Sequence, residues 1–126
     1  MYAVVGVVVI IVVVVVALFL GGYFGGTTGT PVSINDDGTC ATNATSCNFN
    51  PANVTITHGG TVTWTNKGTA ANGHTVTNDP GYTSSMSFDK SLSSNGATAS
   101  IQFSTAGTYH YYCSIHAWMK GTVVVS

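Results

Sequence analysis

The chain contains no arginine and no glutamate, and only 6% of its residues are charged. Three lysines and four aspartates give a formal net charge of −1 at pH 7. Nucleic-acid binding requires clustered Lys and Arg that displace counterions from phosphates, so we expect no nucleic-acid partner. Solubility must come from Thr, Ser and Asn, a composition that suits a surface outside the cell. An acidic or otherwise extreme habitat is one explanation for so few charged residues.

Beyond the first twenty residues the sequence also lacks any amphipathic helical pattern. Short segments of β-branched and aromatic residues alternate with Gly- and Asn-rich turns, which predicts an all-β sandwich. His58, Gly59 and Gly60 are expected to form a tight hairpin turn. The expected strands are residues 32–35, 53–57, 61–66, 74–78, 98–103, 108–113 and 121–126, with a short edge strand at 86–88.

The first twenty residues contain no charged or strongly polar side chain. About 20 apolar residues match one membrane crossing as a helix, and hydrocarbon favours the helix even for a valine-rich segment because the backbone must satisfy its own hydrogen bonds. We therefore predict a transmembrane anchor helix at residues 1–22. A Gly- and Thr-rich linker at 23–31 follows, and then one domain at 32–126, which is within the usual domain size.

Two alternatives remain for this N-terminal segment. A cleaved signal peptide normally has a shorter apolar core that follows positive charge, and neither feature is present. Hydrophobic N-terminal helices also form the core of archaeal-type pilus filaments, so a filament or other homo-oligomer assembled through residues 1–22, in an archaeal source, is the second alternative. No Lys or Arg flanks the segment, so the charge rule for membrane orientation does not apply.

Three candidate metal ligands lie within seven residues near the C-terminus. Cys113, His116 and Met119 are each separated by two residues, and His74 supplies a second imidazole from a distant segment. Soft sulfur stabilises Cu(I) and imidazole serves both oxidation states; a His2Cys set with a weak bond to Met is the blue-copper arrangement. The sequence therefore predicts one copper ion that transfers single electrons.

The segments around these residues resemble a known family. Residues 105–116 and 119–125 resemble the penultimate strand, ligand loop and last strand of plastocyanin-like cupredoxins, and the short Cys-x2-His-x2-Met loop is most similar to that of amicyanin. Residues 49–56 and 60–66 resemble the early strands. The resemblance covers residues 32–126 and implies a cupredoxin-type Greek-key β-sandwich, here preceded by the N-terminal helix.

The resemblance also implies roles at the site. Cys113 would bind type 1 copper as a thiolate, with His74 and His116 in the plane and Met119 in an axial position. The carbonyl of Gly73 would be a further weak axial neighbour. Many cupredoxins have Asn directly after the first histidine, where this chain has Thr75. Its hydroxyl could replace the usual link between the ligand loops, and Ser114 is well placed as its partner.

The chain has three cysteines, and the copper site accounts for the odd number. If Cys113 is a ligand, Cys40 and Cys47 remain as a pair with six residues between them. Such a pair is expected to form a disulfide in an oxidising compartment. A disulfide and a copper–thiolate centre both favour a domain on the outer side of the membrane. The sequons at Asn43 and Asn53 make both asparagines candidate glycosylation sites.

Strand periodicity separates the aromatic residues before the site. Alternation places Tyr109, Tyr111 and Cys113 on the inner face, and His110 and Tyr112 on the outer face. Exposed apolar patches usually mark interaction sites. The predicted surface for redox partners of a respiratory or other electron-transfer chain consists of Tyr112, Ile115, Ala117 and Trp118.

Other copper functions are less well supported. Copper nitrite reductases and multicopper oxidases contain cupredoxin domains, but they need further copper centres built from additional histidines, so we expect no enzyme. The binuclear copper subunit of haem-copper oxidases needs two cysteines in the ligand loop, whereas position 117 is Ala. A copper-storage protein, or a filament subunit in which redox cycling is incidental, remains an alternative to an electron carrier.

Overall fold

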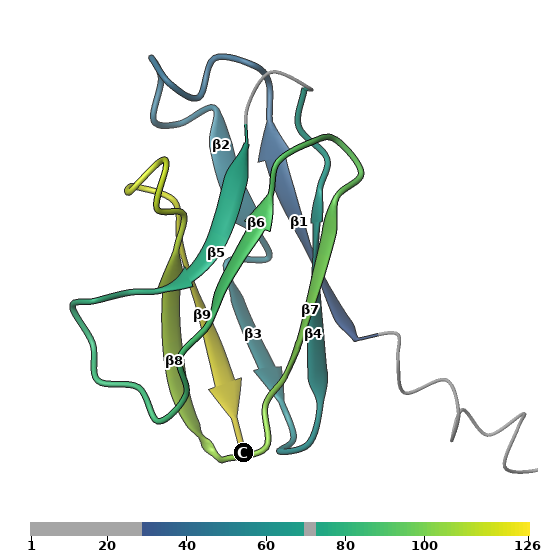
Figure 1. The fold of residues 1–126 in the computed structure, drawn as a ribbon, viewed down its shortest axis with the longest axis vertical. Helices are drawn as coiled ribbons and strands as arrows, with labels where there is room; N and C mark the ends of the chain where they lie inside the picture. Colours follow the sequence, from purple (N-terminus) through teal and green to yellow (C-terminus); the bar gives the residue numbers. More distant parts are fainter. Residues whose placement is uncertain (1–28, 70–72) are drawn as a thin grey trace, which may run out of the picture.

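A computed structural model describes residues 29–69 and 73–126, which form nine β-strands and no helix (Figure 1). The all-β prediction is confirmed for this part of the chain. The strands are β1 (Thr30–Asp36), β2 (Cys47–Asn50), β3 (Asn53–Ile56), β4 (Thr61–Asn66), β5 (His74–Asn78), β6 (Asp89–Leu92), β7 (Thr98–Gln102), β8 (Gly107–Tyr112) and β9 (Lys120–Val125).

The strands form two sheets. One sheet has the order β2-β1-β4-β7 and the other has the order β3-β9-β8-β5-β6. The pairs β1–β4 and β3–β9 are parallel, and the remaining pairs are antiparallel. The chain passes from one sheet to the other after β2, β3, β4, β6 and β7. The result is the two-layer sandwich expected of a cupredoxin.

Alternating side chains from both sheets fill the space between the layers. In β4, Val62 and Trp64 are fully buried between half-buried threonines, which is the period-2 pattern of a strand with one inner face. In β8, Tyr109 and Tyr111 are buried and Tyr111 packs edge-on against Trp64, with ring centroids 5.3 Å apart. The predicted inward orientation of Tyr109, Tyr111 and Cys113 is confirmed.

Two strands differ from the sequence prediction. The polar strand β2 was not predicted, because its asparagines resemble a loop although Cys47 and Phe49 point inward. The edge strand expected at residues 86–88 does not form there; the edge strand is β6, at Asp89–Leu92, where Leu92 faces His74 across the pair. Only Leu92 is buried in β6, so the strand has little apolar signal of its own.

The predicted hairpin at His58, Gly59 and Gly60 is wrong, although a turn forms there. The N–H of Gly60 donates to the carbonyl of Thr57 at 2.9 Å, and Gly59 has a φ of 85°, which only glycine adopts without strain. However, β3 and β4 belong to different sheets. The turn therefore joins the two layers.

The predicted helix at residues 1–22 lies outside the described residues. Within residues 29–69 and 73–126, no helix is long and apolar enough to cross a membrane.

Two loops from distant parts of the chain meet at one end of the sandwich. The β1–β2 connection, drawn in blue, and the β8–β9 connection, drawn in yellow, both lie at the end opposite the C-terminus (Figure 1). The start of β5 reaches the same end. This end contains the candidate metal ligands.

Candidate metal centre

Three donor atoms converge at this end of the sandwich. The Sγ of Cys113 lies 3.9 Å from Nδ1 of His74 and 3.8 Å from Nδ1 of His116. These atoms all lie within 4.8 Å of one another, and all three residues are buried. Two imidazole nitrogens and one thiol directed at a common point form a set that could hold one transition-metal ion.

The fold explains why these residues meet. His74 is the first residue of β5, and Cys113 directly follows β8, the strand that pairs with β5. The loop after Cys113 closes on itself, because Met119 N–H donates to the carbonyl of His116 at 2.9 Å and Cys113 N–H donates to the carbonyl of Met119 at 3.0 Å. This closed turn keeps His116 and the buried Met119 beside Cys113.

The environment of Cys113 favours its thiolate form. Burial raises the pKa of the thiol, but hydrogen bonds from His74 and from backbone N–H groups, led by that of Thr75, lower it from 9.0 to about 6. The Thr75 N–H lies 3.3 Å from the sulfur. A thiolate is the form of cysteine that binds metals, so the free protein already holds this sulfur in a form suited to a metal.

The predicted link between the two ligand segments is confirmed. The Oγ1 of Thr75 accepts a hydrogen bond from the N–H of Ser114 at 2.7 Å and lies 3.0 Å from Oγ of Ser114. A threonine hydroxyl therefore makes the connection for which many cupredoxins use an asparagine. The link joins the residue after His74 to the residue after Cys113.

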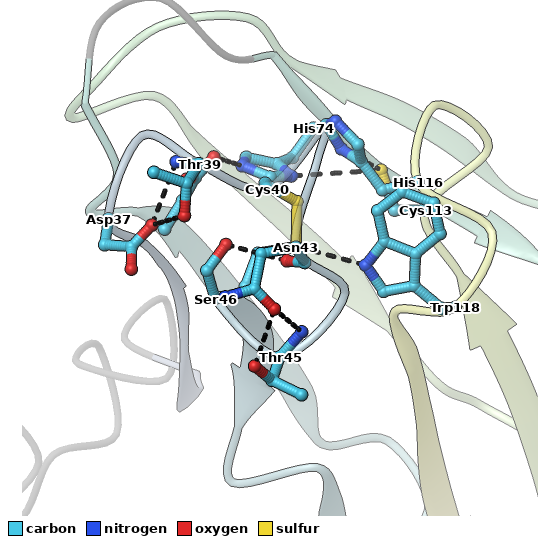
Figure 2. The surroundings of a disulfide bond; sticks show 12 residues. Asp37, Thr39, Cys40, Asn43, Thr45, Ser46, His74, Cys113, His116 and Trp118 are labelled. Atoms are coloured by element: carbon cyan, nitrogen blue, oxygen red, sulfur yellow. Dashed lines mark hydrogen bonds and ion pairs between the residues drawn. A yellow bond between two sulfur atoms is a disulfide. The ribbon is translucent and has the colours of Figure 1, made fainter.

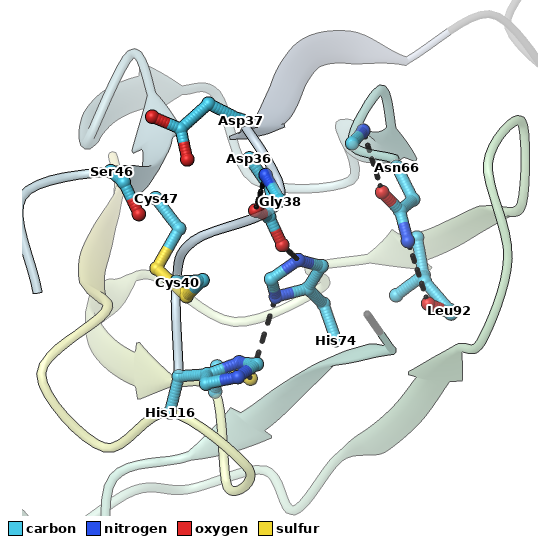
Figure 3. A network of polar contacts seen from close by, with 12 residues as sticks. Asp36, Asp37, Gly38, Cys40, Ser46, Cys47, Asn66, His74, Leu92 and His116 are labelled. Atoms are coloured by element: carbon cyan, nitrogen blue, oxygen red, sulfur yellow. Dashed lines mark hydrogen bonds and ion pairs between the residues drawn. A yellow bond between two sulfur atoms is a disulfide. The ribbon is translucent and has the colours of Figure 1, made fainter. Parts of the chain in front are cut away.

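Sequence reasoning did not identify Asp36 as part of this site. Its Oδ2 lies 2.9 Å from Nε2 of His74, and both side chains are fully buried (Figure 3). Burial lowers the pKa of His74, whereas hydrogen bonds to Cys113 and Asp36 raise it above its usual 6.5 in the balance. Val32, Ile34 and Asp36 alternate on the inner face of β1. An acidic residue at an inward-facing strand position was therefore the one feature of the sequence that could have indicated this contact.

The predicted disulfide between Cys40 and Cys47 is confirmed, with Cα atoms 5.3 Å apart. It lies beside the site, and Figure 2 shows Cys40 next to His74, His116 and Trp118. The indole N–H of Trp118 donates to Sγ of Cys47 at 3.3 Å. Trp118 belongs to the ligand loop and its ring centroid lies 5.5 Å from that of His116. The disulfide loop and the ligand loop therefore contact each other.

Apolar side chains surround His116. Ile115 is 58% exposed and Trp118 is 44% exposed, whereas His116 itself is only 5% exposed. Ala117 is exposed and Tyr112 is half-buried. The four residues predicted to contact a partner are therefore accessible to different degrees, and their role stays a prediction.

Three further sequence predictions concern residues near this end or on the surface. Gly73 is half-buried beside His74, and its part as an axial neighbour stays a prediction. Asn43 and Asn53 are both exposed. The side chain of Asn43 accepts hydrogen bonds from the backbone and hydroxyl of Thr45, the third residue of its sequon. Glycosylation of either asparagine also stays a prediction.

A β-sandwich with a buried Cys, two converging histidines and a neighbouring Met defines a cupredoxin. The sequence profile of the family described as copper binding proteins, plastocyanin/azurin family, matches residues 37–126. The match covers most of the chain, and the chain belongs to this family.

Individual relatives agree with this assignment. A plastocyanin from Scenedesmus fuscus is 40% identical over 85 residues, which covers 61% of this chain and 85% of that protein. Amicyanin-alpha from Methylorubrum extorquens is 38% identical over 77 residues, covering 61% of this chain and 63% of that protein. The solved structure of a purple cupredoxin from Nitrosopumilus maritimus is 30% identical with a TM-score of 0.63, covering 77% of this chain and 99% of that one.

Proposed function

We propose that this protein is a type 1 copper electron carrier in which His74, Cys113, His116 and Met119 hold one copper ion. The observation that carries the proposal is the convergence of two Nδ1 atoms on the buried sulfur of Cys113. Copper bound to two imidazoles, a thiolate and a weak thioether gains and loses one electron with little change in geometry. Membership of the copper-binding family supports the same assignment.

The residues of this chain would perform distinct parts of that function. Cys113 is held as a thiolate by His74 and by the N–H of Thr75. The Thr75–Ser114 link fixes the distance between the two ligand segments. The exposed side chains of Ile115, Ala117 and Trp118, with Tyr112 beside them, would contact a redox partner in front of His116. The backbone carbonyl of Gly73 would be a further weak neighbour of the metal.

The electron-carrier function is preferred to an enzymatic one. Plastocyanin- and amicyanin-like cupredoxins are electron carriers rather than enzymes. Among the described residues, the only group of three or more His, Cys, Asp or Glu side chains placed to hold a metal is that of His74, Cys113 and His116. The partners would be redox proteins of a respiratory or other electron-transfer chain.

We further propose that the domain functions on the outer side of a membrane to which residues 1–22 anchor it. The Cys40–Cys47 disulfide supports this location, because disulfides persist in oxidising compartments. The uncharged apolar N-terminal segment supports the anchor. Electron microscopy of native material would separate an anchored monomer from a filament subunit, and N-terminal sequencing would reveal a cleaved leader.

Copper loading of the full-length chain tests the proposed function. The native protein is expected to develop an intense thiolate-to-copper absorption band and to undergo a reversible one-electron titration, whereas Cys113→Ser removes the band. The band position would also show whether the protein is blue, as the donor set predicts, or purple, like the Nitrosopumilus maritimus relative. A native protein that binds copper without this band or without a reversible titration would indicate copper storage instead.

A further inference from the structure

Asp36 is a fully buried acidic residue directly beside a proposed copper ligand. Its carboxylate and the ring of His74 each have 0% exposed side-chain surface, and Oδ2 lies 2.9 Å from Nε2. Moving a carboxylate out of water is costly unless hydrogen bonds or an opposite charge compensate. An acidic residue in so costly a position requires a physical explanation, and its contact with His74 indicates one.

The orientation of the His74 ring determines what this contact does. Nδ1 faces the sulfur of Cys113 at 3.9 Å. Nε2 faces Asp36 on the other side of the ring (Figure 3). An imidazole that binds a metal through Nδ1 carries its proton on Nε2. The group that accepts a hydrogen bond from this N–H fixes the ring orientation. Asp36 Oδ2 is placed to accept it.

The position of Asp36 is itself well supported. Its Oδ1 accepts a hydrogen bond from the N–H of Gly38 at 2.7 Å. Asp36 is the last residue of β1 and lies opposite Cys47, one of the two disulfide cysteines. A Cβ atom on Gly68 would come within 2.7 Å of the Asp36 Cβ, so the neighbouring backbone packs closely against this side chain. The carboxylate therefore has little freedom to move away from His74.

We propose that Asp36 is the positioning residue for His74 and that its negative charge stabilises the oxidised copper ion relative to the reduced one. This inference rests on the copper site proposed above. The carboxylate accepts a hydrogen bond from Nε2–H of His74. This makes the imidazole a stronger electron donor, as hydrogen-bond acceptors on metal-bound histidines do. Because Cu(II) carries one more positive charge than Cu(I), a nearby buried carboxylate stabilises Cu(II) more.

The adjacent residue provides a matched control. Asp37 is exposed, and its Oδ1 accepts hydrogen bonds from the N–H and the hydroxyl of Thr39 at 2.9 and 2.7 Å. Both aspartates therefore stabilise the start of the same loop, but only Asp36 reaches His74. Asp36→Asn and Asp37→Asn each remove one negative charge, at adjacent positions, and leave the shape of the side chain nearly unchanged.

The experiment compares the copper-loaded full-length native protein with these two variants. Asp36→Asn is expected to raise the reduction potential, to shift the thiolate-to-copper absorption band and to lower Cu(II) affinity by about 10- to 100-fold, the usual effect of losing such an acceptor. Asp37→Asn is expected to keep the native potential, band and affinity. A purely structural role for Asp36 would lower the stability of the metal-free protein without moving the potential, and that result would overturn the proposal.

The native protein offers a second test that needs no variant. In the reduced, diamagnetic copper form, NMR is expected to show a slowly exchanging Nε2 proton on His74, because Asp36 holds it in a buried hydrogen bond. No described residue hydrogen-bonds Nε2 of His116, so its proton is expected to exchange faster. Equal exchange of the two protons would overturn the proposal, because Asp36 would then not hold the His74 ring, and this test of the positioning role is available even if Asp36→Asn does not fold.

The outcomes separate this inference from the proposed function. A native protein that shows the thiolate-to-copper band, together with an Asp36→Asn variant of native potential and affinity, overturns the role of Asp36 alone. A native protein that binds no copper overturns the proposed function, and this inference with it.

Discussion

His74 and His116 present the same ring nitrogen to Cys113, but the protein holds them in different ways. His74 begins the interior strand β5 and is 1% exposed, and its second nitrogen is hydrogen-bonded to the carboxylate of Asp36. His116 lies in a loop between exposed residues, and its second nitrogen has no hydrogen bond to a described residue. One ligand is therefore fixed by the sheets, whereas the other depends on the loop that carries it.

This difference separates two requirements of an electron carrier. The metal geometry must stay constant during electron transfer, and the metal must also come close to a partner. The sheet side of the site, with His74, Thr75 and Asp36, meets the first requirement through buried hydrogen bonds. On the loop side His116 is itself buried, but it lies between the exposed side chains of Ile115 and Trp118, so this side would meet the second requirement. The predictions below test this division, from the largest expected effect to the smallest.

The largest effect is expected on the Cys113 thiol of the metal-free protein. Burial opposes the shift in its pKa, but the hydrogen bonds from His74 and from the N–H of Thr75, both on the sheet side, lower this pKa to about 6. His74→Ala should therefore raise this pKa strongly. His116→Ala should change it less, because the backbone N–H groups of His116 and Ile115, which lower this pKa from the loop side, remain in the variant. Thiolate absorbance as a function of pH measures the pKa of Cys113 in both variants. Equal shifts in the two variants would contradict the division between the sheet side and the loop side.

The same shift makes stability depend on pH. A thiol whose pKa falls from 9.0 in the unfolded chain to about 6 in the folded one stabilises the metal-free protein fully above pH 9, and this contribution is lost as the pH falls towards 6. The raised pKa of His74 acts in the opposite sense, because its contribution is present below 6.5 and is lost as the pH rises. Once His74 is neutral, the free energy of unfolding should rise up to pH 9, and Cys113→Ser should abolish that rise.

Removal of the disulfide should have the next largest effect. The double variant Cys40→Ser, Cys47→Ser is expected to lower the free energy of unfolding of the metal-free protein by about 2 kcal/mol, because a short loop is no longer closed in the unfolded chain. Denaturant titration measures the loss. The native protein under reducing conditions should show the same loss, and an unchanged midpoint in both would show that the loop is held by its other contacts.

Thr75→Val tests the link between the sheet side and the loop side. The variant keeps the shape of the side chain but leaves the N–H of Ser114 without its partner at 2.7 Å, which should cost about 1 kcal/mol of unfolding free energy. Copper should also dissociate faster, because the ligand loop is less firmly attached. Thr108→Val is a suitable control, since Thr108 is an exposed strand threonine. Equal effects of the two changes would show that the link does not stabilise the site.

The ligand loop and the main strands could be predicted from the sequence because their signals are local. The spacing of Cys113, His116 and Met119 lies within one short segment, and β4 and β5 have the predicted bounds because turn residues limit them on both sides. The Thr75–Ser114 link could also be predicted, because each residue directly follows a proposed ligand. The ligand spacing and the strand bounds depend on residues that are neighbours in the chain, whereas the link joins residues 39 positions apart and was expected only from the family resemblance.

The features that could not be predicted depend on contacts between distant segments. Asp36 and His74 are 38 positions apart, and the pairing of β1 with β2 and β4 places the end of β1 at the site. The strands β2 and β6 are short and polar, and each forms because an adjacent strand supplies its hydrogen-bond partners. The contact between Trp118 and Cys47 joins residues 71 positions apart. Such pairs follow from sheet order, which periodicity alone does not determine.

The smallest effect is expected from Trp118→Phe, which removes the contact between the ligand loop and the disulfide loop. The indole N–H donates to a sulfur atom at 3.3 Å, and sulfur is a weak acceptor, so the loss should be below about 1 kcal/mol. The reduction potential should remain near the native value, because Trp118 contacts the ring of His116 without bonding to it. If the variant instead shifts the potential as far as Asp36→Asn does, the loop side fixes the metal geometry as firmly as the sheet side, and the division drawn between the two histidines is wrong.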